Sequence, residues 1–207
     1  MLAKRFRHFP GRRDWRRVWK WEDRALRRLA GLPVPRTFGY GVHPGPDGRE
    51  IILRKEFLEG EPLATVTPRE AVEMARLLAA IHDRLVITGD PSVQNFIRRP
   101  DGSLAFLDFG RARTFWFHSP YYHGYVGKEL VRFYRTGLGG LSANWEAALQ
   151  AYREASRFGR VACWLQNACF WYWLARQTRK HHAPVEPISP FGTSPEKTSR
   201  RRSFRIS

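Results

Sequence analysis

Three oxygen-bearing side chains flank a short predicted hairpin, and their spacing constrains the fold more than any other feature of the sequence. Asp90 precedes Asn95 by five residues; Asn95 stands just before one short apolar run, and Asp108 follows a second. The segment 98–103 between the two runs contains Pro, Asp and Gly, which are typical of a hairpin turn. We therefore expect the three side chains to lie near one end of the same hairpin.

Carboxylates and an amide in this arrangement suit phosphoryl transfer to a hydroxyl group. The Asp90 carboxylate can accept the proton of an attacking hydroxyl. Asn95 and Asp108 offer hard oxygen ligands, the kind that Mg²⁺ takes when it bridges nucleotide phosphates. The alternative is that Asp90 and Asn95 only form turns and Asp108 only caps a strand, which would require three coincidences at once.

The pattern resembles the protein-kinase-like superfamily, with residues 90–95 as its catalytic loop and Asp108-Phe109-Gly110 as its metal-binding triplet. The resemblance implies an α+β, bilobal fold with a truncated N-lobe and a mostly helical C-lobe. It also implies ATP and Mg²⁺ as cofactors. Asp90, Asn95 and Asp108 are then the catalytic residues, with Asp90 as the base and Asn95 and Asp108 as the metal ligands.

The beginning of the chain supports the same resemblance. Residues 2–6 resemble the strand whose lysine contacts the nucleotide phosphates, which assigns that contact to Lys4. Glu22 lies on the apolar stripe of an amphipathic helix predicted over 13–30, where an unpaired carboxylate would be costly to bury. The resemblance pairs Glu22 with Lys4, whereas the alternative makes Lys4 an ordinary exposed lysine.

Residues 56–60 resemble the hinge whose backbone holds the adenine, which implies contacts from backbone groups of Glu56 and Leu58. Lys55, beside the hinge, could substitute for Lys4, although a lysine at such a place more often faces solvent. His82 ends a predicted helix, and we interpret it as a packing residue rather than an acid or base.

The sequence also departs from the superfamily. Thr88 stands where a His usually precedes the catalytic Asp, no Arg directly precedes Asp90, and no Ala-Pro-Glu follows Gly110. These departures favour small-molecule, sugar or atypical acceptors over ordinary protein phosphorylation. Only three residues precede Lys4, so the strands of the glycine-rich loop are expected to be missing. An upstream start, a shortened active form and a degenerate kinase are the alternatives left open.

Within the superfamily the compact layout is most similar to bacterial lipopolysaccharide core kinases, which phosphorylate Kdo or heptose, and next to RIO-type atypical kinases. We therefore expect ATP- and Mg²⁺-dependent phosphorylation of a sugar hydroxyl of lipopolysaccharide core. A RIO-like atypical protein kinase and a catalytically inactive kinase-like binding module are the alternatives.

Breaks at Gly and Pro residues predict an N-lobe over 1–60, a C-lobe over 61–182 and a disordered basic tail over 183–207. The remaining elements predicted are strands over 36–42 and 50–57 and helices over 67–84, 125–136, 144–156 and 160–180. The helix after Thr67 has the clearest start, because Thr67, Pro68 and Glu70 form a capping-box pattern. Residues 163–174 are apolar nearly all round, which favours a helix buried within the lobe.

The charge of the chain points to phosphate-bearing partners. The 207 residues include 36 Lys and Arg against 19 Asp and Glu, a net charge of +17. Such a surface suits an anionic glycolipid or sugar substrate, while an arginine bias without any specific partner is the alternative. The hypothesis of a nucleic-acid partner depends on the net charge alone, and we do not favour it. The oligomeric state is not predicted.

The cysteine count and hydropathy bear on the compartment. Two cysteines, Cys163 and Cys169, exclude a disulfide scaffold. No apolar core follows the basic N-terminal residues, and the longest apolar stretch, 161–175, is shorter than a bilayer-spanning helix. We therefore expect a cytoplasmic protein, with peripheral association at the inner face of the cell membrane left open.

Overall fold

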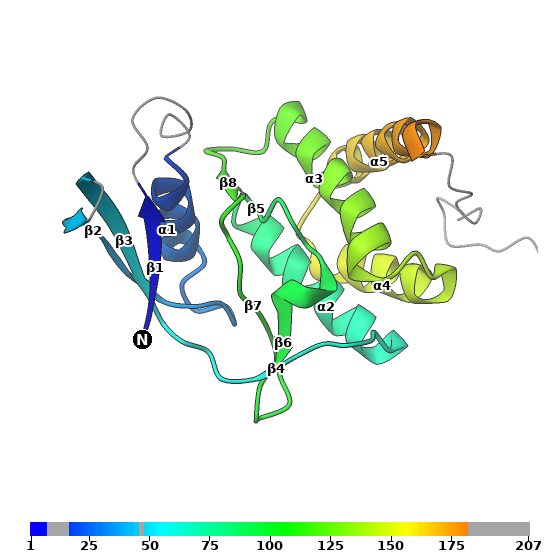
Figure 1. Ribbon diagram of the computed structural model, residues 1–207. Helices are drawn as coiled ribbons and strands as arrows, with labels where there is room; N and C mark the ends of the chain where they lie inside the picture. The colour runs from blue at the N-terminus through cyan, green and yellow to red at the C-terminus, as the bar shows by residue number, and fades with distance from the viewer. Residues whose placement is uncertain (8–16, 46–47, 182–207) are drawn as a thin grey trace, which may run out of the picture.

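The structure, a computed structural model, describes residues 1–7, 17–45 and 48–181. Within these residues the chain forms five α-helices and several small antiparallel sheets, which confirms the predicted α+β class. A three-stranded sheet with α1 lies at one side of the molecule, and the remaining helices gather at the other (Figure 1). In chain order the elements are β1 Leu2–Arg7, α1 Val18–Arg28, β2 Thr37–Gly45, β3 Gly48–Lys55, β4 Glu61–Pro62, α2 Pro68–Asp83, β5 Val86–Ile87, β6 Phe96–Arg98, β7 Leu104–Phe106, β8 Arg113–Thr114, α3 Pro120–Arg132, α4 Ser142–Ala155 and α5 Arg160–His181.

The first sheet has the strand order β1-β3-β2, with all pairs antiparallel. Lys4 on β1 lies opposite Leu53 on β3. The β2–β3 ladder continues to the pair Gly45 and Gly48, so both strands reach further into the hairpin than predicted, and β3 ends at Lys55. Helix α1 packs beside this sheet and begins at Val18; the earlier part of the predicted helix, 13–16, lies outside the described residues.

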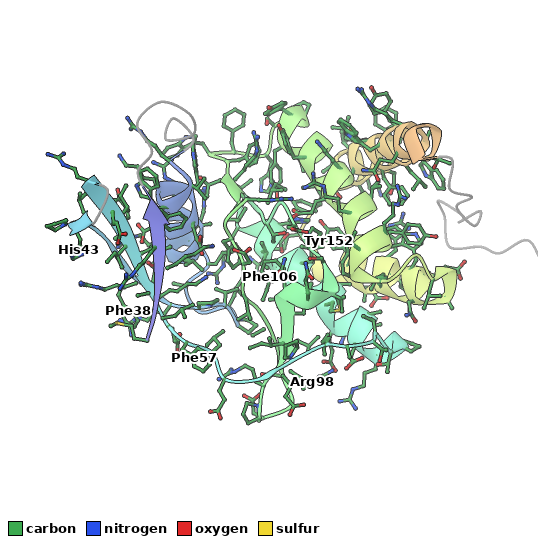
Figure 2. All side chains as sticks on the ribbon, viewed as in Figure 1. Phe38, His43, Phe57, Arg98, Phe106 and Tyr152 are labelled. Carbon is green, nitrogen blue, oxygen red and sulfur yellow. The ribbon has the colours of Figure 1, made fainter. Side chains whose placement is uncertain are left out.

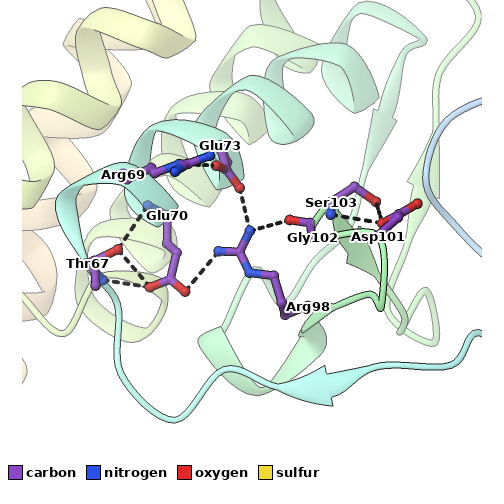
Figure 3. A network of polar contacts seen from close by, with 8 residues as sticks. All are labelled: Thr67, Arg69, Glu70, Glu73, Arg98, Asp101, Gly102 and Ser103. Atoms are coloured by element: carbon purple, nitrogen blue, oxygen red, sulfur yellow. Dashed lines mark hydrogen bonds and ion pairs between the residues drawn. The ribbon is translucent and has the colours of Figure 1, made fainter.

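Helix α2 begins with the predicted capping box (Figure 3). The Thr67 hydroxyl accepts from the Glu70 N–H at 3.2 Å, and the Glu70 carboxylate accepts from the Thr67 N–H at 2.8 Å. Arg98, at the end of β6, donates to Glu70 and Glu73 at 2.9 and 2.8 Å and also to the Gly102 carbonyl oxygen. One guanidinium group therefore ties the start of α2 to the β6–β7 turn.

The predicted hairpin is present as β6 and β7, with Phe96 opposite Phe106. The ring centroids of Phe96 and Phe106 lie 4.9 Å apart, and those of Phe106 and Phe109 lie 5.1 Å apart, both in edge-to-face geometry. Phe106 and Tyr152 lie in the interior of the molecule, whereas Phe38 lies at its edge (Figure 2). The hairpin is thus held by an aromatic core directly under the predicted site.

The C-terminal helices form where predicted, with shifted bounds. Helix α3 begins five residues before the expected start at 125, because Ser119 caps it by accepting from the Tyr122 N–H at 3.1 Å and Pro120 occupies the first turn. Residues 133–137 continue it as a π-helical turn. Helices α4 and α5 match the predicted ranges within two residues. The predicted tail, 183–207, lies outside the described residues.

Helix α5 differs from its prediction as a buried helix. It packs along α3 through one face, on which Gln166, Phe170 and Leu174 are buried. Val161 and Trp164 on another face are 74% and 65% exposed. An apolar pattern on all sides does not indicate which face of a helix packs against a neighbouring element. In α5 the face toward α3 is buried, and the face with Val161 and Trp164 is exposed. Across the residues that the structure describes, none of the helices has the length and apolar character required to cross a bilayer.

Candidate active site

The Lys4 ammonium group contacts two carboxylates from distant parts of the chain. Its Nζ lies 2.9 Å from Glu22 Oε2, on α1, and 3.1 Å from Asp108 Oδ1, just after β7. The predicted pair between Lys4 and Glu22 is therefore present. Since β1, α1 and the end of the hairpin each supply one member, this contact joins the small sheet to the rest of the molecule.

Lys55 is a second partner of Glu22. Its Nζ lies 2.9 Å from Glu22 Oε1 and donates to the Leu107 carbonyl oxygen at 3.3 Å. The side chain is only 7% exposed, so the expectation that Lys55 faces solvent is wrong. It lies at the end of the central strand β3, where the fully buried Glu22 carboxylate compensates the cost of burying an ammonium group.

The contacts set the protonation states of Lys4 and Asp108. Burial alone would lower the pKa of Lys4, but the neighbouring charges of Glu22 and Asp108 outweigh burial and raise this pKa. Burial alone would raise the pKa of Asp108, but the hydrogen bond from the Gly110 N–H and the charge of Lys4 lower it. At neutral pH Asp108 is therefore an ionised carboxylate beside a charged lysine.

Glu129, on α3, anchors the segment that leads to Asp90. Its carboxylate is buried and accepts from the Thr88 N–H at 3.1 Å and from the Gly89 N–H at 2.6 Å. The Thr88 hydroxyl donates to the same carboxylate. Thr88 thus holds its segment through Glu129.

His82 completes this buried network. One ring nitrogen lies 2.8 Å from Glu129 Oε2 and the other 2.7 Å from the Tyr152 hydroxyl. His82 is fully buried, in agreement with its interpretation as an interior residue. The two hydrogen bonds add a role that packing alone does not describe, because they orient the carboxylate that holds residues 88 and 89.

The backbone at Gly89 brings the Asp90 loop against the turn 108–111. Gly89 has φ +81°, and a Cβ atom there would lie 2.4 Å from the Arg111 carbonyl oxygen, so only glycine fits. Arg132 donates to the Gly89 carbonyl oxygen. Arg111 Nη1 lies 3.7 Å from Asp90 Oδ2. Asp108 therefore begins this short turn, and Asp90 lies beside Arg111 at its other end.

Asn95 links the two carboxylate-bearing segments. Its Nδ2 donates to the Asp90 carbonyl oxygen at 2.8 Å and to Ser92 Oγ at 3.2 Å. The backbone carbonyl oxygen of Asn95 accepts from the N–H of Leu107, the residue before Asp108, at 2.9 Å. Asp90, Asn95 and Asp108 thus gather at one end of the β6–β7 hairpin, as their spacing predicts.

Two side-chain oxygen atoms at this end of the hairpin could hold a hard cation, namely Asn95 Oδ1 and Asp108 Oδ2. Among the described residues, no hydrogen bond engages Asn95 Oδ1 or Asp108 Oδ2, while the other polar atom of each side chain is engaged. No three His, Cys, Asp or Glu side chains of the described chain form a metal cluster. One carboxylate and one amide match Mg²⁺, which binds through few protein ligands together with waters and substrate phosphates.

The predicted hinge leaves backbone groups open. Glu56 is tied to Arg36: the Glu56 N–H donates to the Arg36 carbonyl oxygen at 2.7 Å, and the Glu56 carboxylate accepts from the Arg36 N–H at 3.0 Å. In the part of the chain that is described, neither the Glu56 carbonyl oxygen nor the Leu58 N–H makes a hydrogen bond. Both groups could therefore serve a ligand.

Glu129, Arg111 and Arg132 are site residues that the sequence analysis missed. Glu129 and Arg132 stand three residues apart on a helix that was predicted, so they share one helix face. Nothing in the sequence indicates which carboxylate or guanidinium group on a helix will meet a distant loop. Arg111 directly follows the triplet, and its position there was the one available signal.

No model of a known protein family matches the sequence, and a comparison with curated proteins likewise finds no match.

Proposed function

We propose that the chain is an ATP- and Mg²⁺-dependent phosphotransferase with a protein-kinase-like, bilobal fold, in which residues 1–60 form the N-lobe and 61–182 the C-lobe. The observation that carries this proposal is the contact of Lys4 with both Glu22 and Asp108 at 2.9 and 3.1 Å. A cation, two carboxylates and an amide support phosphate positioning, and the open hinge groups that follow β3 support binding of the adenine.

The side chains divide the work of the reaction. Lys4 would attract phosphate oxygens of the nucleotide, and Glu22, itself paired with Lys55, would hold Lys4 in place. Asn95 and Asp108 would hold Mg²⁺, which supplies neutralisation of phosphate charge when bound. The Asp90 carboxylate would accept the proton of the acceptor's hydroxyl group. The hydroxyl oxygen would bond to the γ-phosphorus as the bond between that phosphorus and the ADP oxygen breaks.

For the acceptor we propose a sugar hydroxyl of lipopolysaccharide core. The net charge of +17 favours an anionic glycolipid or sugar over a neutral one. Such a substrate would place a cytoplasmic protein at the inner face of the cell membrane, held there through its acceptor. The charge alone does not make nucleic acid a partner.

Transfer of labelled γ-phosphate from Mg-ATP to purified lipopolysaccharide core tests the proposal. We expect transfer by the wild type, and loss of transfer in Asp90→Asn and Asp108→Ala. Asp101→Asn is the matched control, because Asp101 is an exposed carboxylate on the hairpin turn, far along the strands from the site. Retained transfer in Asp108→Ala would refute the metal assignment.

The identity of the labelled acceptor distinguishes the proposed sugar kinase from the two alternative functions. Labelled protein in place of labelled sugar would favour a RIO-like atypical protein kinase. Mg-ATP binding without transfer to any acceptor would favour a kinase-like binding module.

A further inference from the structure

A cavity of about 730 Å³ lies beside the turn 108–111. Helix α1, strand β8 and helix α3 form its walls, together with Gly89 and residues 110–112. Its lining includes Gly110 but neither Lys4 nor the hinge residues, so the cavity adjoins the proposed nucleotide site without sharing those contacts. Its volume is in the range of small-molecule sites.

The lining of this cavity carries excess positive charge. Arg111, Arg113, Lys128 and Arg132 all line it. Glu129 is the one carboxylate among the described lining residues, and it is buried and engaged by the Thr88 and Gly89 segment. The described part of the lining therefore offers no free carboxylate to pair with these cations.

The environment of Lys128 shows how crowded these cations are. Burial lowers the pKa of Lys128, and the charges of Arg132, Arg113 and Arg176 lower it further. Lys128 Nζ lies over the Trp173 ring, 4.4 Å from its centroid, and Arg176 Cζ lies over the same ring at 5.5 Å. A bound anion would relieve the repulsion among these groups.

Aromatic side chains supply the rest of the wall. Trp21 and Tyr121 line the cavity and are 41% and 65% exposed. Arg113 lies over the Tyr125 ring, with 4.9 Å between its Cζ and the ring centroid, and the Tyr121 and Tyr125 hydroxyls are 3.1 Å apart. Flat apolar faces with hydroxyl tips beside cations suit a compact polar ligand with an anionic group.

We propose that this cavity binds the acceptor, and that the acceptor carries a phosphate monoester held by Arg113 and Lys128. Gly89 lines the cavity and directly precedes Asp90, and Arg111 lies 3.7 Å from Asp90 Oδ2, so a hydroxyl of the bound molecule can approach the base. Arginine and lysine are the side chains that hold phosphate oxygens. The identity as an acceptor rests on the proposed function, whereas phosphate-ester binding does not.

Calorimetric titration of the full chain, without nucleotide, tests the site with three probes: glucose 6-phosphate, inorganic phosphate and glucose. We expect glucose 6-phosphate to bind more tightly than either of the others. Lys128→Met and Arg113→Gln should each weaken its binding at least about tenfold, since each removes a charge-assisted contact. Arg76→Gln, at an exposed position of α2 outside the cavity, should leave it unchanged.

Three results would overturn the site: no binding of glucose 6-phosphate at millimolar concentration, equal binding of glucose, or unchanged binding in both cavity variants. Far-UV circular dichroism checks that the variants are folded. Lys4→Met separates this site from the proposed function, because it should weaken Mg-ATP and spare glucose 6-phosphate. If Mg-ATP fails to bind while glucose 6-phosphate binds through Lys128, the phosphotransferase is refuted and the cavity stands.

Discussion

Lys4 and Asp108 lie 104 residues apart in the sequence, and their side chains meet at 3.1 Å. The first strand of the chain and the end of the β6–β7 hairpin thus share one ionic contact. Glu22 contacts the same lysine at 2.9 Å. A cation held between two carboxylates beside Asp90 and Asn95 is the basis on which we infer phosphate positioning.

Removal of Lys4 should change the titration of Asp108. In Lys4→Met the carboxylate loses a cation that stabilises its charged form, while the burial that raises its pKa remains. The pKa of Asp108 should therefore rise, and ¹³C NMR of the carboxyl carbon measures it. Lys20→Met, on the exposed side of α1, is the matched control. An Asp108 pKa that stays in place in Lys4→Met would show that the contact does not persist in solution.

Glu22 should matter more to stability than the exposed carboxylates do. Glu22→Gln leaves the buried Lys55 without its carboxylate, and breaking a buried ion pair in this way costs about 3 to 5 kcal/mol. Urea unfolding at pH 7 measures this free energy. Glu59→Gln, an exposed carboxylate beyond the hinge, should change it little. A loss below about 1 kcal/mol would mean that Lys55 is not buried as described.

The capping carboxylate Glu70 should make stability depend on acid pH. Burial would raise the pKa of Glu70, but its hydrogen bonds from Thr67 and Arg98 lower it below the ordinary 4.5. Its contribution to stability is therefore present above pH 4.5 and is lost as the pH falls through the lowered pKa. Glu70→Gln should be less stable than wild type at pH 7 by up to about 1 kcal/mol. Urea unfolding at pH 3 should show the difference shrinking; a constant difference would contradict the assignment.

Glu129 should act on turnover through the Asp90 loop. Glu129→Gln replaces an acceptor of the Thr88 and Gly89 N–H groups by an amide that offers one oxygen. The loop should shift, and kcat should fall about 10- to 100-fold while KM for ATP stays within about threefold. Steady-state kinetics checks the split. Equal losses in kcat and ATP affinity would indicate general damage to the fold instead.

Local signals in the sequence predicted the parts of the molecule that depend on neighbouring residues. The α2 capping box and the β6–β7 hairpin follow from residues within a few positions of one another, and both form. The spacing of Asp90, Asn95 and Asp108 was informative because a hairpin fixes where its two ends meet. The position of Glu22 on an apolar stripe predicted that it needs a cation, and the family resemblance supplied Lys4 as that cation.

The remaining features depend on tertiary contacts that the sequence does not specify. Lys55 looks like a surface lysine until β3 is placed centrally in its sheet against Glu22. Glu129 looks like any carboxylate on a helix until the loop at residue 88 meets it. The apolar pattern of α5 gave no direction, and its exposed Trp164 shows that pattern alone does not establish burial.

Calorimetric titration of the wild-type chain with ATP, in the presence and absence of Mg²⁺, tests the central claim most directly. We predict binding of one nucleotide that requires Mg²⁺ and weakens at least about tenfold in Asp108→Ala, which keeps the Lys4–Glu22 pair. Absence of binding at millimolar Mg-ATP by the folded wild type, or unchanged affinity in Asp108→Ala, would contradict it.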